Sequence, residues 1–234
     1  MSHNRLSKKL VWAIKNRCTE RVERLLKKRA DVSNATDKNG DTAFVLACNA
    51  GSVEIIKILV DMGVVNLKDY HDDIIHKAFV QAITVSRHTR HETVNYIASL
   101  KLLLESGADV NRNTGCYYET PLKLACSHMS VETVKLLLNK GANVNVKDIH
   151  GNTALTDMSY DIVGMDDKSS FTPEYFSWNY NIVSLLLQNG ADLNAKDNEG
   201  QTALMMLCNH NNYKSYMVVS LLLQNGADVN IKNN

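Results

Sequence analysis

The sequence predicts an all-α solenoid in which short helical repeats stack on one another, and three observations support this. One phrase, in its full form Gly-Ala-Asp-Val-Asn, recurs in copies that start at Gly63, Gly107, Gly141, Gly190 and Gly226. An apolar triplet precedes each copy, namely Ile58–Val60, Leu102–Leu104, Leu136–Leu138, Leu185–Leu187 and Leu221–Leu223. A turn followed by threonine opens most of the units. Repetition at this spacing is typical of stacked repeats, and three adjacent apolar residues cover roughly 200° of a helix, which therefore needs neighbours on both flanks.

The second repeat shows most plainly which elements a unit contains. Asn39-Gly40 has the residues of a tight turn and Thr42 is a favourable N-cap, so a helix is predicted over Ala43–Asn49. A second helix is predicted over Val53–Met62 from the helical spacing of its apolar residues. Gly63 ends that helix, because glycine adopts the left-handed conformation at little cost. Each unit is therefore a turn followed by two helices.

The helix-start motifs resemble those of the ankyrin-repeat family. The segments that carry the resemblance are Glu119-Thr120-Pro121-Leu122, Gly151-Asn152-Thr153-Ala154-Leu155 and Gly200-Gln201-Thr202-Ala203-Leu204. The resemblance covers nearly the whole chain and implies one domain of antiparallel helix pairs with short β-hairpin fingers, spanning 1–234. The approximate repeats are 4–36, 37–69, 70–112, 113–147, 148–196 and 197–234. The resemblance also implies a role in protein–protein interaction.

The composition is that of an ordinary folded protein and narrows the possible partners. Hydrophobic residues make up 44% and charged residues 22%, with a formal net charge of +1. Residues 1–30 are rich in Lys and Arg, which suits either a solvated end of the stack or contact with an acidic partner. Nucleic acid is not favoured, because Trp12 alone is an aromatic residue among these charges. No apolar run reaches the ~20 residues of a membrane span, and no signal-peptide core is present. We therefore expect an intracellular protein, either cytoplasmic or delivered into a host cell.

Repeats three and five are longer than the others. In repeat three Thr89 and Glu92 form a capping pair, and in repeat five Thr172-Pro173 opens a helix, so both second helices are predicted to be lengthened. The insert of repeat five carries the aromatic residues Phe171, Tyr175, Phe176 and Trp178. These residues form either a contact surface, since aromatic residues anchor interfaces, or the packing of the long helix onto its own repeat. Both alternatives stay open.

The cysteine and histidine residues predict neither a catalytic nor a metal site. Cys48, Cys126 and Cys208 occupy one repeat slot and are predicted to be small buried residues. Five cysteines without framework spacing indicate a reducing compartment. His88 and His91 lie beside arginines, which would repel a metal cation. No phosphate-binding loop, nucleophile elbow or zinc motif is present. We expect no metal, no cofactor and no enzymatic activity.

The predicted function is binding of another protein through the finger tips and the concave face of the first helices, as the resemblance implies. The predicted contact residues are Lys38, Asn39, Asp41, Asn49, Ala50, Tyr117, Tyr118, Glu119, Ser127, His128, Ile149, His150, Asn152, Asn198, Glu199, Gln201, Asn209 and His210. For the two tyrosines, packing against a neighbouring finger is the alternative. The alternative function is a structural, self-associating scaffold segment. It follows from the point where the chain stops, which we expect to leave Met205–Met206 and Leu221–Leu223 partly bare. Otherwise a monomer is expected.

Overall fold

A computed structural model describes most of the chain, and its contacts divide the chain into two compact units. The described residues are 2–28, 30, 32, 35–63, 93–105, 107–112, 119–128, 130–164, 173–209 and 213–233. Unit 1 comprises residues 1–109 and unit 2 comprises residues 110–234. Among the described residues, no helix combines the length and the apolar composition that crossing a bilayer requires.

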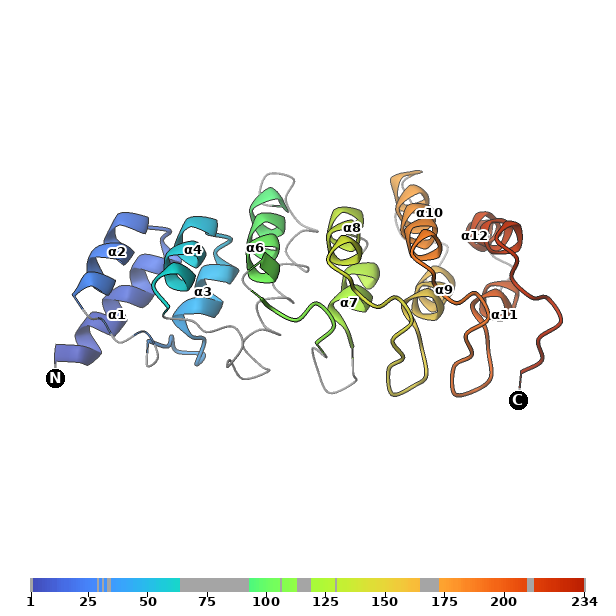
Figure 1. The fold of residues 1–234 in the computed structure, drawn as a ribbon, viewed down its shortest axis with the longest axis horizontal. Helices are drawn as coiled ribbons and strands as arrows, with labels where there is room; N and C mark the ends of the chain where they lie inside the picture. Colours follow the sequence, from blue (N-terminus) through green and yellow to red (C-terminus); the bar gives the residue numbers. More distant parts are fainter. Residues whose placement is uncertain are drawn as a thin grey trace. The chain divides into compact units, whose positions relative to one another are not determined.

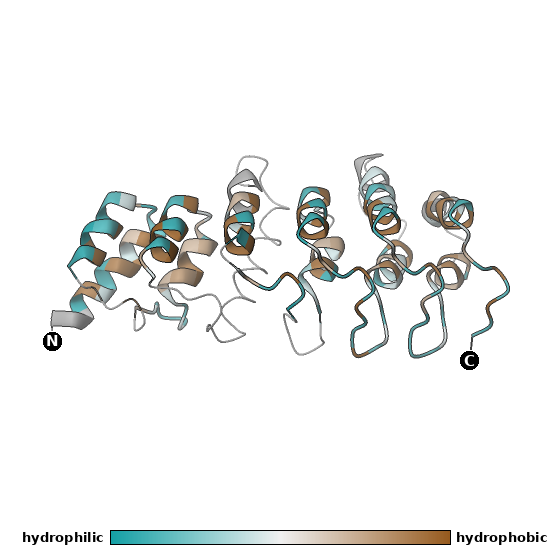
Figure 2. Ribbon diagram, viewed as in Figure 1, coloured by the Kyte–Doolittle hydropathy of each residue, from teal (hydrophilic) through white to brown (hydrophobic). Residues whose placement is uncertain are grey.

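The described part of unit 1 contains five helices (Figure 1). They are α1 (Ser2–Lys15), α2 (Thr19–Lys27), α3 (Ala43–Asn49), α4 (Val53–Asp61) and α6 (Thr93–Glu105). Helix α1 packs against α2 and α3, and α4 packs against α3 and α6. Figure 2 shows long hydrophilic stretches on α1 and α2, in agreement with the basic composition of this end.

Unit 2 is built from three helix pairs. Its helices are α7 (Pro121–Ser127), α8 (Val131–Asn139), α9 (Ala154–Gly164), α10 (Pro173–Gln188), α11 (Ala203–Cys208) and α12 (Tyr213–Gln224). The first helices α7, α9 and α11 pack against one another in series, and so do the second helices α8, α10 and α12. Each first helix also packs against the second helix of its own pair. Unit 2 is therefore a two-layered stack, with loops projecting beyond the row of first helices (Figure 1).

The threonines at the helix starts act as N-caps, as predicted. The Thr120 side chain accepts a hydrogen bond from the Lys123 backbone N–H at 3.3 Å, and Thr42 and Thr202 cap α3 and α11 in the same way. Such a cap satisfies a backbone donor that the first turn leaves free, typically stabilising the helix by ~1 kcal/mol. The predicted bounds of α3 agree with the structure, and α4 ends at Asp61, one residue earlier than predicted.

The apolar triplets lie on the second helices and supply the centre of the core. The middle residue of every triplet is fully buried, namely Leu59, Leu103, Leu137, Leu186 and Leu222. Each such side chain stabilises the fold by roughly 1.5–3 kcal/mol relative to an exposed one. In the last triplet Leu223 is 45% exposed, which agrees with the prediction that this triplet is partly bare.

The loops that precede the first helices are short hairpins, here called finger two (residues 37–41), finger five (residues 148–152) and finger six (residues 197–201). In each finger the first aspartate donates its backbone N–H to the carbonyl of the fifth residue, at 3.0 Å. The carboxylate of the same aspartate accepts from the N–H groups two and four residues later. This side chain fixes the turn. One isolated antiparallel bridge, Thr36 with Thr42, is the only β pairing within the described residues.

The insert of repeat five lengthens both helices of its pair. Helix α10 begins at Pro173, as predicted, and has 16 residues against 9 in α8. Helix α9 also continues to Gly164 and has 11 residues against 7 in α7. Asp161 is therefore helical, because the insert extends the first helix before it turns. The capping pair of repeat three, Thr89 with Glu92, lies outside the described residues.

The cysteine prediction is right at two positions and wrong at the third. Cys48 and Cys126 are each 1% exposed, and burial raises the pKa of the Cys48 thiol to about 12 and that of the Cys126 thiol as well. Cys208 is exposed instead. It is the last residue of α11, and no described first helix packs beyond α11 to cover it.

Candidate protein-binding site

The predicted contact residues of unit 1 lie on finger two and at the end of α3. Lys38 and Asn39 are exposed at the finger tip, and Asp41, Asn49 and Ala50 are partly exposed. Tyr117, Tyr118, Phe171 and His210 lie outside the described residues, as do the side chains of Tyr175 and Phe176. Trp178, on α10, is 43% exposed. The choice between contact surface and internal packing therefore stays a hypothesis for these aromatic residues.

The predicted contact residues of unit 2 divide into exposed and buried positions. On fingers five and six and at the end of α11, five predicted residues are exposed: Ile149, His150, Asn198, Glu199 and Asn209. Glu119, Ser127, His128 and Gln201 are partly exposed. Asn152 is only 9% exposed, so its side chain is part of the interior rather than of the outer surface.

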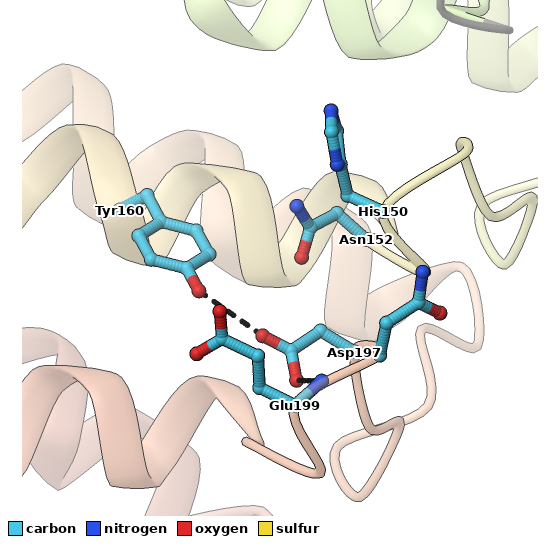
Figure 3. Close-up of a pocket in the computed structure, with 6 residues that line it drawn as sticks. His150, Asn152, Tyr160, Asp197 and Glu199 are labelled. Carbon is cyan, nitrogen blue, oxygen red and sulfur yellow. Dashed lines mark hydrogen bonds between the residues drawn. The ribbon is translucent and has the colours of Figure 1, made fainter.

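Four of these residues meet at one pocket between fingers five and six. The pocket has a volume of about 270 Å³ and is lined by His150, Asn152, Tyr160, Asp197, Asn198 and Glu199 (Figure 3). Tyr160 comes from α9, and the other residues come from the two fingers. Tyr160 and Asp197 were not predicted as site residues. Asp197 opens finger six in the slot of Asp37 and Asp148, and Tyr160 follows one turn after Thr156 in α9.

The two fingers are held together by direct contacts. The Asn198 backbone N–H donates to the His150 carbonyl at 3.0 Å, and the Asn198 side-chain amide donates to the Ile149 carbonyl at 2.9 Å. Gly151 lies between them with φ +79°, where a Cβ atom would be 2.6 Å from the Asn198 side-chain oxygen. Only glycine fits this close approach, so the pocket wall is fixed before any partner arrives.

Asp197 is the centre of the hydrogen bonding in the pocket. Its Oδ1 accepts from the backbone N–H groups of Glu199 at 2.9 Å and Gln201 at 2.8 Å, and its Oδ2 accepts from the Tyr160 hydroxyl at 3.0 Å. Burial, the hydrogen bond to Asp197 and the nearby carboxylates raise the pKa of Tyr160 to about 12. The phenol therefore stays protonated at neutral pH and acts as a donor.

Asn152 presents an unsatisfied acceptor to the pocket. Its backbone N–H donates to Asp148 at 2.8 Å, and its backbone carbonyl accepts from the Lys123 ammonium at 3.0 Å. The side-chain oxygen Oδ1 is buried without a hydrogen-bond partner. In Figure 3 this oxygen points toward the side of the pocket where Tyr160, Asp197 and Glu199 carry theirs. A buried carbonyl without a partner costs free energy, which a donor from outside would recover.

One repeat earlier, beside finger five, the buried side chain of Lys123 occupies the position that corresponds to the pocket. Its side chain is 1% exposed, and its Nζ lies 2.6 Å from Asp148 Oδ2 and 2.6 Å from Asp157 Oδ2. With the Asn152 carbonyl, these oxygens satisfy all three ammonium protons. The sequence analysis did not single out Lys123. A charged residue in a slot that elsewhere holds Val45, Thr156 and Met205 was the available indication.

Acidic side chains gather along the first helices of unit 2. Burial raises the pKa of Glu119, Asp157 and Asp161, and the proximity of other carboxylates adds to each shift. The pKa of Asp148 is lowered, because the bond from Lys123 and two backbone N–H donors outweigh its burial. Asp157 shares the same lysine, but its deeper burial outweighs that contact and no backbone N–H bond counters it, so its pKa is raised. Within the described part of the chain, no group of three or more potential ligands could hold a metal ion.

A second, apolar pocket lies on repeat six. It has a volume of about 240 Å³ and is lined by Thr202, Leu204, Met205, Cys208, Val219, Leu223, Asp228, Val229 and Ile231. Leu223 and Val229 are 45% and 67% exposed. Of the residues predicted to be partly bare, Leu223 is exposed and Met205 is partly exposed, as predicted, whereas Met206, Leu221 and Leu222 are buried.

Solved structures of similar shape are ankyrin repeat domains. The ankyrin repeat domain from Acinetobacter baumannii AYE is 27% identical, with a TM-score of 0.68, and the match covers 94% of this chain and 98% of that one. The ankyrin repeat domain of Bcl-3, described as a unique member of the IkappaB protein family, is 24% identical with a TM-score of 0.69. That match covers 96% of this chain and 89% of that one. At this identity the likeness to Bcl-3 shows the fold alone.

Curated relatives match over part of the chain. Palmitoyltransferase AKR1 of Lachancea kluyveri is 28% identical over 108 residues, which are 46% of this chain and 14% of that protein. L-asparaginase of Dirofilaria immitis is 31% identical over 147 residues, 62% of this chain and 22% of that protein. The B-cell lymphoma 3 protein homolog of Mus musculus is 31% identical over 121 residues, 52% of this chain and 25% of that protein. The chain thus spans a quarter or less of the length of these relatives.

The match to a family model covers nearly the whole chain. The model is described as ankyrin repeats (3 copies), and it matches residues 10–112, 91–160 and 166–233. These ranges include the helix pairs of both units. The fold predicted from the repeated motifs is confirmed, and this chain belongs to the ankyrin-repeat family.

Proposed function

We propose that this chain binds a partner protein, and that fingers five and six with the adjoining first helices of unit 2 form the contact surface. The observation that carries the proposal is the rigid pairing of the two fingers around the pocket, with His150 and Glu199 exposed at its rim. A surface fixed in advance loses little conformational entropy on binding. The exposed residues of finger two form a separate candidate surface on unit 1, and we propose that the repeats of both units belong to one binding domain.

We infer that the binding is not accompanied by catalysis. Ankyrin repeats are protein-interaction modules, and the two enzymes among the relatives share 14% and 22% of their length with this chain. We place the protein inside a cell, because Cys48 and Cys126 are unpaired thiols that suit a reducing compartment. Action on a host protein is a narrower form of the same proposal and rests on the composition of the sequence.

The experiment combines partner identification with matched variants. Affinity purification of the full chain and mass spectrometry identify the candidate partner, whose affinity is then measured for His150→Ala and Glu199→Ala. Because interface anchors cost more than ~1 kcal/mol when truncated, each variant should bind about fivefold more weakly or worse. The control variants Gln188→Ala and Gln224→Ala change exposed residues at the ends of second helices. Equal affinities for the finger variants and the controls would refute the proposed surface.

A self-associating scaffold is the second candidate function, and the apolar pocket on repeat six favours it. Leu223 and Val229 expose apolar surface beside this pocket. Light scattering of the full chain should then detect dimers that Leu223→Lys abolishes and the neighbouring control Gln224→Lys preserves. A monomer at every attainable concentration would exclude this function.

A further inference from the structure

In two repeats the first aspartate of a finger is paired with a lysine from the first helix of the preceding repeat. In unit 1 the Lys15 ammonium, from α1, lies 2.8 Å from Asp37 Oδ2. In unit 2 the Lys123 ammonium, from α7, lies 2.6 Å from Asp148 Oδ2. The fold therefore brings a cation to this carboxylate twice, and in both cases the chain supplies the cation itself.

The corresponding aspartate of finger six has no such cation. The slot of Lys123 is held in α9 by Thr156, which is fully buried and hydrogen-bonded to Thr153. Asp197 Oδ2 accepts instead from the neutral Tyr160 hydroxyl. Across the described residues, neither Asp197 nor Glu199 forms an ion pair with a lysine or an arginine. Two carboxylates at one pocket are thus left without a compensating positive charge.

The pocket offers the same set of acceptors that Lys123 uses. Lys123 is bound by two carboxylates and one amide carbonyl. The pocket is lined by two carboxylates, Asp197 and Glu199, and by the buried and unpartnered amide oxygen of Asn152 (Figure 3). An ammonium group has three protons and no acceptor, so it satisfies three such oxygens at once. Charge-assisted bonds of this kind are roughly twice as strong as neutral ones.

The pocket suits a single side chain that enters from outside. Its volume of about 270 Å³ is below the ~300–1,000 Å³ of clefts that take whole small-molecule ligands. Tyr160 is 42% exposed, and His150 and Glu199 are exposed as well, so the rim is accessible to a docked protein.

We propose that this pocket receives the ammonium group of a lysine side chain of the partner protein. The proposal rests on the protein-binding function proposed above and names the chemistry that the contact surface recognises. Lysine is assigned rather than arginine, because both internal examples, Lys15 and Lys123, present an ammonium group to the finger aspartate.

The test titrates a minimal probe into the ¹⁵N-labelled full chain. The probe is Nα-acetyl-L-lysine N-methylamide, and its uncharged counterpart is the same derivative of norleucine. The lysine probe should shift the Asn152 side-chain amide and the Glu199 backbone amide saturably, whereas the norleucine probe should leave both unchanged. Glu199→Gln should weaken the lysine probe about tenfold, as expected for loss of a hydrogen bond to a charged group.

The control for the variant is Asp192→Asn. It makes the same change in net charge at an exposed residue that does not line the pocket, and the lysine probe should bind it as it binds the unmodified chain. Three results would overturn the proposal: no saturable shift, an equal response to norleucine, or equal weakening by both variants. Tighter binding of the corresponding arginine derivative would overturn the assignment to lysine.

The two experiments distinguish a failure of the lysine pocket from a failure of the proposed contact surface. If partner affinity depends on His150 and Glu199 while the lysine probe does not bind, the surface stands and the lysine pocket is refuted. If the probe binds and partner affinity is insensitive to both residues, the pocket binds an ammonium group, but the proposed surface and the assignment to a lysine of the partner are both refuted.

Discussion

Asp148 and Asp197 occupy the same position in successive fingers, and one difference between their surroundings lies in a slot of the first helices. At Asp148 the slot holds Lys123, whose buried ammonium fills the space. At Asp197 the slot holds Thr156, and a pocket remains beside a tyrosine hydroxyl. The residue in this slot is thus one difference between a finger carboxylate paired inside the protein and a finger carboxylate that lines a pocket.

The frame itself is nearly identical in the two fingers. Asp148 Oδ1 accepts from the backbone N–H groups two and four residues later, both at 2.8 Å. Asp197 Oδ1 makes the equivalent bonds at 2.9 and 2.8 Å. Because these bonds hold the turn, the second carboxylate oxygen, Oδ2, has an equivalent position in each finger. The repeated turn therefore fixes the position of the aspartate carboxylate, and the residue in the helix slot determines which group lies beside it.

The largest effect is expected from removing the internal cation. Lys123→Met leaves Asp148 and Asp157 without their shared ammonium, and breaking a buried ion pair on one side costs about 3–5 kcal/mol. Urea unfolding followed by circular dichroism measures the loss against Lys135→Met, an exposed lysine of α8. A difference from that control below about 1 kcal/mol would mean that the filled position does not stabilise the unit.

The contact between the fingers gives the second largest effect. Gly151→Ala and Gly190→Ala each force alanine into a left-handed conformation, at about 1–2 kcal/mol. Only at Gly151 does the added Cβ also meet the backbone of finger six, which adds about 1–3 kcal/mol. Urea unfolding should therefore rank Gly151→Ala as clearly the more destabilising. Equal losses would show that the fingers separate freely.

The pH dependence of stability should distinguish the carboxylates whose pKa is lowered in the folded state from those whose pKa is raised. The pKa of Asp148 is lowered in the folded state, so its contribution is present above the ordinary value of 3.8 and is lost as pH falls through the folded pKa. Asp148→Asn should destabilise the protein at neutral pH, and the difference should vanish in acid. The comparison is made by urea unfolding at a series of pH values.

Asp161 should behave in the opposite sense. Its pKa is raised in the folded state, so the fold gains stability below 3.8 and loses it as pH rises through the folded pKa. Asp161→Asn should therefore stabilise the protein at neutral pH relative to its effect in acid. The same pH series tests this, and a variant that loses stability at neutral pH would contradict the burial argument.

The helix pairs and turns of the repeats could be predicted from the sequence, whereas the pocket could not. Repetition, N-cap threonines and apolar triplets predicted the helix pairs, since these features depend on local propensity and on periodic burial. The pairing of Lys123 with Asp148 joins residues 25 positions apart, so no local sequence pattern predicts it. Tyr160 holds the helix slot of Asn49 and Ser127, and it was missed because no local pattern shows that its hydroxyl reaches Asp197, 37 residues later. Asn152 was predicted as an exposed contact, but the packing of finger six against Gly151 covers it.

The smallest expected effect is a change in the pKa of Tyr160, whose hydroxyl bonds Asp197 where a lysine bonds Asp148. The pKa of Tyr160 is about 12 against the ordinary 10.0, and Asp197→Asn should lower it by removing the carboxylate that accepts its proton. NMR titration of ¹³Cζ-labelled tyrosine, assigned with Tyr160→Phe, measures the shift. Asp192→Asn serves as the matched control and should leave the titration unchanged. An unaltered pKa in Asp197→Asn would remove the electrostatic contrast between the two fingers.

Moving the lysine to the open position tests the central claim most directly. Thr156→Lys places an ammonium in the slot that Lys123 occupies one repeat earlier, and the Thr153 cap can be kept because it accepts from the backbone of position 156. With the fold verified by circular dichroism, the account predicts that Tyr160 titrates closer to its ordinary pKa and that the lysine probe no longer binds. A folded Thr156→Lys protein that binds the probe as before, with the Tyr160 pKa still about 12, would contradict it.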